Sequence, residues 1–160
     1  MNALNEDVVR LLHAAMLIGR IDTRLVCDKA LPSVRGDPVQ LEQVLLNVVM
    51  NAAEAISTGR DGPRVITIRT RRNRPGHVVV EVADTGVSVE DAELEHIFEH
   101  FVSAKPNELG MGLAISRSII AANGGRMWAT ASADCGLTMH IELACVSESG
   151  SGAAVAVDAV

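Results

Sequence analysis

The chain has 160 residues, of which 48% are hydrophobic and 21% are charged, so it is long enough for one domain with a buried core and too short for two. A net charge of −6 and a pI near 5.3 argue against a nucleic-acid or anionic-membrane surface, and no run of about 18 apolar residues predicts a membrane span. The three cysteines fit neither a disulfide framework nor a zinc site, which favours a reducing cytosol: Cys27, Cys135 and Cys145.

The first third of the chain predicts a helix, a short strand and a second helix. Asn5 is the expected cap of a first helix of about three turns, whose apolar residues recur at helical spacing: Val8, Leu11, Leu12, Ala15 and Ile18. Residues 24–27 alternate weakly and predict a strand. Asp37 stands before Pro38 as a capping residue before a proline in the first turn, and so predicts the start of the second helix.

The second helix, over residues 41–57, carries a narrow polar stripe on an otherwise apolar surface. At about 100° per residue, its polar side chains fall within a sector of roughly 80°: Gln43, Asn47, Asn51 and Glu54. A helix this apolar is expected to be buried, and a buried polar stripe needs hydrogen-bond partners. Because asparagine lowers helix stability, Asn47 and Asn51 are expected to serve something outside the helix.

The remaining residues predict mainly strands. Two β-rich runs, at residues 65–68 and 78–82, indicate a hairpin with a Pro–Gly turn. The long connection over residues 84–110 has little β pattern, and connections of this length usually have a function. The last elements expected are a helix over residues 110–122 and strands over residues 126–131 and 137–143.

This order of elements predicts an α/β fold in which helices lie on one face of a mostly antiparallel sheet. We expect a single domain over residues 1–146. The segment over residues 147–160 opens with serine and glycine and is expected to be a linker or tail.

Two groups of polar residues could bind a ligand. Asp84 ends the second strand of the hairpin, before Thr85 and Gly86, so its carboxylate could accept a hydrogen bond from an exocyclic amine; an ordinary Asx turn is the alternative. Asn47 and Asn51 offer amide oxygens of the kind that Mg²⁺ prefers, and hydrogen bonding to the backbone is the alternative there.

A second pair of features could bind phosphate. Gly110, Met111 and Gly112 open a helix whose free N–H groups and partial positive charge suit an anion, although glycines before helices also serve packing. Lys105, in the long connection, could reach a phosphate as a point charge or simply be solvated.

Taken in order, the asparagines, the Asp-x-Gly strand end, a Phe-x-x-Phe pair and the Gly-x-Gly helix start resemble the motifs of the GHKL ATP-binding superfamily. Within it, the chain most resembles the catalytic and ATP-binding (HATPase_c) domain of bacterial sensor histidine kinases, in the nitrogen-regulator and rhizobial oxygen-sensor group. The matching segments are QLEQVLLNVVMNAAEAI (40–56), VADTG (82–86), IFEHFVSAKP (97–106), GMGLAISRSIIAANGG (110–125) and GLTMHIEL (136–143). The resemblance implies the Bergerat-type fold, a two-layer α/β sandwich on a mixed sheet with a mobile ATP lid.

The resemblance implies ATP and Mg²⁺ as cofactors. Asp84 would read the adenine amino group, with Thr138 assisting through water, and Gly86 would let the backbone approach the base. Asn51, with Asn47, would hold Mg²⁺ against the phosphates. Contacts to the phosphates would come from the lid and the helix start: Lys105, Gly110, Met111, Gly112 and Leu113.

The resemblance also bears on the reaction. In ATP-hydrolysing members, a glutamate general base stands one turn before the metal-binding asparagine, and here that position is Asn47. An amide cannot take a proton from water at neutral pH, so we expect phosphoryl transfer to a positioned acceptor, with Asn47 and Lys105 as catalytic residues. Hydrolysis with Glu54 as a substitute base is the alternative.

Two residues depart from the family pattern. Ser88 stands where the second glycine of the Asp-x-Gly-x-Gly motif is usual, and a positive φ there would cost serine about 1 kcal/mol. Glu108 stands where the lid usually has glycine, and its charge would repel phosphate. A degenerate GHKL module that binds nucleotide weakly or not at all and acts as an interaction domain is therefore a second hypothesis.

The expected partners follow from what this sequence lacks. No histidine is followed by an acidic residue in the manner of a phosphoacceptor motif, so the acceptor is expected on a separate dimerisation/phosphoacceptor domain of the same kinase. A response regulator receiver domain is the next expected partner. We expect a cytoplasmic fragment that contacts neither nucleic acid nor membrane, within a full-length protein that could be membrane-anchored.

Overall fold

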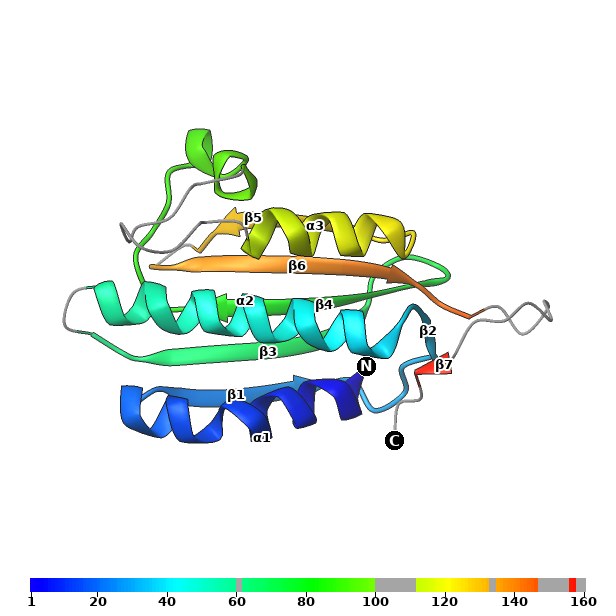
Figure 1. Ribbon diagram of the computed structural model, residues 1–160, viewed down its shortest axis with the longest axis horizontal. Coiled ribbons are helices and arrows are strands. Elements are labelled where there is room, and N and C mark those ends of the chain that lie inside the picture. Colours follow the sequence, from blue (N-terminus) through cyan, green and yellow to red (C-terminus); the bar gives the residue numbers. More distant parts are fainter. Residues whose placement is uncertain (60–61, 100–111, 133–134, 147–155, 158–160) are drawn as a thin grey trace.

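A five-stranded sheet carries three helices on one of its faces (Figure 1). The computed structural model describes residues 1–59, 62–99, 112–132, 135–146 and the backbone of 156–157. Its helices are α1 (Asn2–Gly19), α2 (Pro38–Thr58) and α3 (Gly112–Ala122), with 3₁₀ turns η1 (Asp91–Glu93) and η2 (His96–Phe98). Its strands are β1 (Asp22–Cys27), β2 (Val34–Arg35), β3 (Val65–Arg72), β4 (His77–Asp84), β5 (Arg126–Ala131), β6 (Leu137–Ala144) and β7 (Ala156–Val157).

The strand order confirms the predicted fold class. The sheet runs β1-β3-β4-β6-β5, with β1 parallel to β3 and every other neighbouring pair antiparallel. It is therefore a mixed, mostly antiparallel sheet in a two-layer α/β sandwich. The predicted lid falls largely on residues 100–111, outside the described part of the chain.

The central helix α2 begins where its sequence predicts. The Asp37 side chain accepts hydrogen bonds from the backbone N–H groups of Val39 and Gln40, and Pro38 occupies the first turn, where its missing N–H has no cost. The apolar side of α2 lies in the core against the sheet: Leu41, Val44, Leu45, Val48, Val49, Ala52 and Ile56. This leaves the polar stripe at the edge of that core.

The predicted start of the first helix is wrong. Helix α1 begins at Asn2, and Met1 rather than Asn5 is its N-terminal cap residue. Asn5 lies inside the helix, where its N–H donates to the carbonyl of Met1, and its side chain is 1% exposed. Local capping preference is therefore overridden here by the burial of the preceding turn, in which Met1 and Leu4 join the core.

The two faces of the sheet differ in character. Along β4, Val78, Val80 and Val82 belong to the core, while Glu81 points to the face without helices. Arg71 from the hairpin donates to Glu81 at 2.6 Å, and Arg74 donates to Glu142 at 2.9 Å. The basic hairpin residues thus neutralise carboxylates on the open sheet face.

Helix α3 is fastened to α2 at its C-terminal end. Asn123 follows α3; its Oδ1 accepts from the N–H of Asp37 at 3.1 Å, and its Nδ2 donates to Gln40 at 3.0 Å. The two helices are therefore antiparallel, and the start of α3 lies beside the middle of α2. None of the helices that the structure describes combines the length and apolar composition needed to cross a bilayer.

Part of the predicted tail also pairs with the domain. Strand β7 runs antiparallel to β2, with Val157 opposite Val34. The division into residues 1–146 and 147–160 stays a prediction.

Candidate functional site

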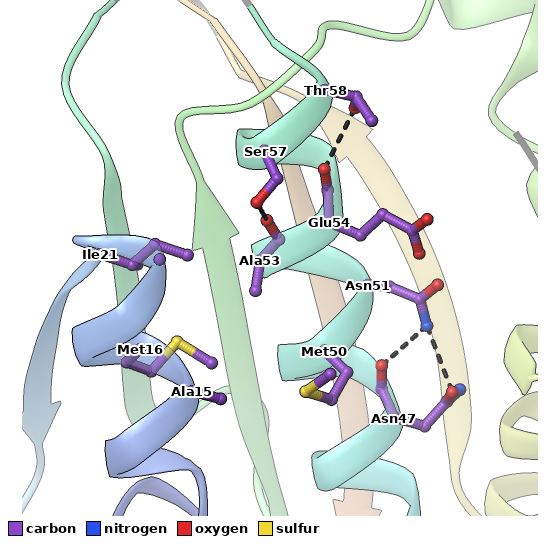
Figure 2. Close-up of a pocket in the computed structure, with 11 residues that line it drawn as sticks. Ala15, Met16, Ile21, Asn47, Met50, Asn51, Ala53, Glu54, Ser57 and Thr58 are labelled. Atoms are coloured by element: carbon purple, nitrogen blue, oxygen red, sulfur yellow. Dashed lines mark hydrogen bonds between the residues drawn. The ribbon is translucent and has the colours of Figure 1, made fainter. Parts of the chain in front are cut away.

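The asparagines predicted to be functional form a small hydrogen-bond network on α2. Asn51 Nδ2 donates to the backbone oxygen of Asn47 at 2.7 Å and lies 3.3 Å from Asn47 Oδ1 (Figure 2). Asn47 Nδ2 donates in turn to Ser116 Oγ on α3 at 3.0 Å. Both amide N–H₂ groups therefore have protein acceptors, which leaves amide oxygens as the groups able to meet a cation.

Both asparagines also line a pocket of about 370 Å³ between α2 and the C-terminal half of α1. Its apolar lining includes Met16, Ile21 and Met50. In Figure 2, Asn47, Asn51 and Glu54 point to the side of α2 away from α1. The polar side chains of this stripe therefore border the pocket but point away from α1, toward the side of α2 where Asn47 meets α3.

Asp84 lies at the end of β4, where the residue is 5% exposed and backbone groups hold its carboxylate. Asp84 Oδ1 accepts from the N–H of Gly86 at 2.8 Å, and the N–H of Leu137 is a second backbone partner. Burial raises the pKa of Asp84 above its ordinary value, and these two hydrogen bonds only partly oppose the rise. A carboxylate with so little compensation can accept a further hydrogen bond.

Two glycines let the segments around Asp84 approach closely. A Cβ on Gly136, whose φ is +81°, would clash with the Asp84 carbonyl. A Cβ on Gly86 would stand 2.5–2.7 Å from backbone atoms of Ala55 and Ile56 in α2. Because Gly86 has no side chain, α2 can pack directly against this loop. The sequence predicted a glycine here so that the backbone could approach the base, and it did not predict this packing role.

The side chains of Thr138 and Asp84 lie on opposite faces of the sheet. In the β4–β6 register Thr138 is opposite Ala83, so its side chain shares the open face with Ala83, whereas Asp84 faces the helices. Thr138 Oγ1 lies 3.3 Å from Ser132 Oγ instead. Leu137, the residue before Thr138 in β6, has its side chain on the face of Asp84, and the assistance of Thr138 through water stays a prediction.

The backbone of Ser88 is not strained, although serine stands where the family motif usually has glycine. Of the non-glycine residues that the structure describes, Arg20 is the one with positive φ, so Ser88 adopts an ordinary backbone conformation. The Ser88 hydroxyl accepts from the N–H of Gly136 at 3.1 Å and ties the Asp84 loop to β6. Glu108, the other departure, lies outside the described residues.

The structure describes two of the residues that were predicted to bind phosphate, Gly112 and Leu113. Gly112 begins α3 against the Asn47 amide, and Leu113 packs at the edge of the core. Lys105, Gly110 and Met111 lie outside the described residues.

The phenylalanine of η2 anchors the segment before the lid. Phe98 is buried in the core, and the Arg117 guanidinium of α3 lies 4.7 Å above its ring. Arg117 also donates to Glu95 at 2.9 Å. Phe98, the first residue of the Phe-x-x-Phe pair, therefore ties this segment to the core, while Phe101 lies outside the described residues.

Sequence reasoning missed three contributors to this site. Ser116 accepts a hydrogen bond from Asn47. The backbone N–H of Leu137 binds Asp84, and Gly136 leaves space for the backbone of Asp84. A serine within the apolar face of α3 was a signal available in the sequence. The backbone N–H of Leu137 had no such signal, because the strand register decides its partner.

The comparisons with known proteins bear on the same motifs. A protein-family model described as "Histidine kinase-, DNA gyrase B-, and HSP90-like ATPase" matches residues 36–152. The sensor protein FixL of Bradyrhizobium diazoefficiens is 35% identical over 153 residues, which cover 89% of this chain and 29% of that protein. The chain therefore spans less than a third of that curated relative's length.

Solved structures share the fold over most of the chain. The catalytic domain of the histidine kinase ThkA matches with a TM-score of 0.78 and 28% identity, over 91% of this chain and 92% of that one. ThkA is also known in complex with the response regulator protein TrrA. Full-length ShkA in complex with AMPPNP matches with a TM-score of 0.77 and 27% identity, over 91% of this chain and 30% of that one.

Proposed function

Because the chain belongs to the histidine kinase-, DNA gyrase B- and HSP90-like ATPase family and is of the sensor histidine kinase catalytic-domain type, we propose that it binds Mg-ATP and donates the γ-phosphoryl group to a histidine. The acceptor histidine lies on a separate dimerisation/phosphoacceptor domain of the same kinase. The observation that carries the proposal is the under-compensated buried carboxylate of Asp84.

Asp84 is assigned to the adenine end of the nucleotide. Its carboxylate is buried, its pKa is raised, and both partners that the described part of the chain offers it are backbone N–H groups. An exocyclic amine would add a donor to an acceptor-only group in a place of low dielectric, where such a bond is strong. The AMPPNP complex of ShkA supports a nucleotide as the ligand.

Asn47 and Asn51 are assigned to the metal. The donor set fits Mg²⁺, because the N–H₂ ends of both amides are used by protein acceptors and hard oxygens remain. Bound with the nucleotide, Mg²⁺ neutralises charge on the phosphates. The N–H groups at the start of α3 are directed to the phosphates, with contacts from Lys105, Gly110, Met111, Gly112 and Leu113.

Transfer is favoured over hydrolysis by the residue at position 47. Asn47 cannot act as a general base toward water, so catalysis here depends on alignment and charge neutralisation, with Lys105 assisting from the lid. Glu54 points to the same side of α2 as Asn47, which keeps hydrolysis as a second candidate reaction (Figure 2).

The partners and compartment follow from this reaction. After the acceptor histidine, the phosphoryl group passes to a response regulator receiver domain, which the ThkA–TrrA complex supports. ATP as the donor places the domain in the cytoplasm, without contacts to nucleic acid or membrane.

Calorimetric titration of the chain with AMPPNP, with and without Mg²⁺, tests nucleotide binding. We expect saturable binding at micromolar concentrations that requires Mg²⁺ for full affinity. Absence of binding would support the degenerate module that Glu108 motivates.

Mixing the chain with γ-labelled ATP and a separate phosphoacceptor domain tests the transfer itself. We expect label on the acceptor histidine and little release of free phosphate. ATP turnover that is abolished by Glu54→Gln would favour hydrolysis over transfer.

A further inference from the structure

Ser116 is the residue of α3 that contacts the amide of Asn47. The Ser116 side chain is 2% exposed, and its Oγ accepts from Asn47 Nδ2 at 3.0 Å. One turn earlier on α3, a Cβ on Gly112 would clash with Asn47 Oδ1 and stand 2.9 Å from Nδ2. The Asn47 amide therefore lies flat on the first turns of α3, with its nitrogen end on Ser116.

The same amide fixes its neighbour one turn along α2. Asn51 Nδ2 donates to the Asn47 carbonyl and lies 3.3 Å from Asn47 Oδ1. If the Asn47 amide turned over, its N–H₂ group would face the N–H₂ group of Asn51, and two donors cannot satisfy each other. The Asn51 N–H₂ group, itself held by the Asn47 backbone oxygen, therefore favours the observed orientation of the Asn47 amide, and Ser116 supplies the acceptor for the amide nitrogen that this orientation turns toward α3.

We propose that Ser116 is a positioning residue, which holds the Asn47 amide so that amide oxygens, and not nitrogens, are presented to the cation that accompanies the nucleotide. The proposal rests on the proposed function, since the cation is the one assigned to Asn47 and Asn51. Because Ser116 lies on α3, the same hydrogen bond joins the metal-binding side of the site to the helix whose start is assigned to the phosphates.

The first test needs no nucleotide. In the NMR spectrum of the chain, the side-chain N–H₂ signals of Asn47 and Asn51 are followed in Ser116→Ala, in Ser116→Cys and in Ser118→Ala. Ser118 is a matched control, because it lies on the same helix and its hydroxyl donates within that helix, to the Ala114 carbonyl. We expect Ser116→Ala to shift and broaden the signals of both asparagines, and Ser118→Ala to leave them unchanged.

The thiol variant separates hydrogen bonding from packing. Cysteine fills the space of serine but accepts hydrogen bonds weakly, so Ser116→Cys is expected to behave like Ser116→Ala. Wild-type Asn47 signals in Ser116→Cys, or unchanged Asn47 signals in Ser116→Ala, would overturn the proposal.

The second test measures the metal. We expect Ser116→Ala to raise the Mg²⁺ concentration for half-maximal AMPPNP binding about three- to tenfold, the loss of one hydrogen bond, and to leave AMPPNP affinity in EDTA unchanged. Equal weakening with and without Mg²⁺ would indicate a structural role only and contradict the proposal. If the wild-type chain binds no AMPPNP, the proposed function fails, while the NMR comparison still decides whether Ser116 orients the amides.

Discussion

Asp84 and Glu142 are two nearly inaccessible carboxylates on neighbouring strands of one sheet, and their surroundings differ in kind. Asp84, 5% exposed, faces the helices and has backbone N–H partners. Glu142, 1% exposed, faces the open side and accepts from Asn73 and Arg74, with Arg126 3.8 Å away. The pKa of the first is raised, and the pKa of the second is lowered.

The opposite pKa shifts separate a ligand-binding carboxylate from a structural one. Burial acts on both in the direction of a higher pKa, but at Glu142 the hydrogen bonds and the arginine charges outweigh it. Glu142 in its ionised form therefore stabilises the fold. Ionised Asp84 destabilises it, which is typical of a group kept for binding rather than for stability.

The largest effect is expected from Asp84→Asn. The amide keeps the shape of the carboxylate but loses its charge, so AMPPNP affinity should fall roughly 100-fold, near the upper value for a hydrogen bond to a charged group. The melting temperature should stay unchanged or rise, because the cost of burying an ionised Asp84 is removed. Glu142→Gln is the matched control and should bind AMPPNP within about twofold of wild type, on the same scale. Unchanged affinity in Asp84→Asn would remove Asp84 from the site.

The second prediction concerns stability, where Glu142 on the open sheet face is expected to matter more than Asp84. Glu142→Gln should lower the free energy of unfolding by about 1–3 kcal/mol, since the Arg74 guanidinium loses its buried charged partner. Because the pKa of Glu142 is lowered by folding, this stabilisation is present above its ordinary value of 4.5 and is lost as the pH falls through the folded value. Urea unfolding at pH 7 measures the difference, with Glu6→Gln on the exposed side of α1 as the control. Equal stability of the two variants would contradict the structural role of Glu142.

Asn5 provides a third case, a buried polar side chain that carries no charge. Within the described residues, Asn5 Oδ1 and Nδ2 lack hydrogen-bond partners. Asn5→Leu should therefore raise the free energy of unfolding by about 1 kcal/mol, measured by urea unfolding. Asn2→Leu is the matched control and should lower it, because Asn2 donates to the Asp28 carbonyl at 2.9 Å and accepts from Thr70 at 2.8 Å. Destabilisation by Asn5→Leu would indicate that Asn5 has a partner after all.

Local patterns predicted the elements of this fold, and the errors occur where distant segments meet. The cap at Asp37 and the β-rich run of β4 are properties of a few adjacent residues, and both were read correctly from the sequence. Asn5 was predicted to be a cap from local preference alone, and the sequence does not show that the packing of α1 buries this residue inside the helix. The face on which Thr138 lies could not be read from the sequence, because it depends on the register between β4 and β6, and a shift of one residue reverses the face of a strand.

The smallest effect is expected at His140, which lies between the open sheet face and solvent. Its ring stacks on Trp128 at 4.9 Å, Nε2 lies 2.8 Å from Thr130 Oγ1, and Nδ1 lies 3.5 Å from Glu81. Burial lowers the pKa of His140 below its ordinary value of 6.5, and although Glu81 raises it, the net shift is downward. Neutral His140 therefore contributes stability that is complete above pH 6.5 and declines as the pH falls toward the folded pKa.

The pH range in which His140 loses its contribution to stability lies above the range for Glu142, so the two groups can be separated by pH. Trp128 is the single tryptophan of the chain, and its fluorescence should change as the stacked imidazole gains a proton. We expect His140→Gln to remove the fluorescence transition and the loss of stability just below pH 6.5, and to leave the loss below pH 4.5 in place, because Glu142 keeps Asn73 and Arg74. His13→Gln, on the exposed side of α1, should change neither. A fluorescence transition that survives in His140→Gln would assign it to another group and leave Glu142 as the acid-sensitive residue of the open face.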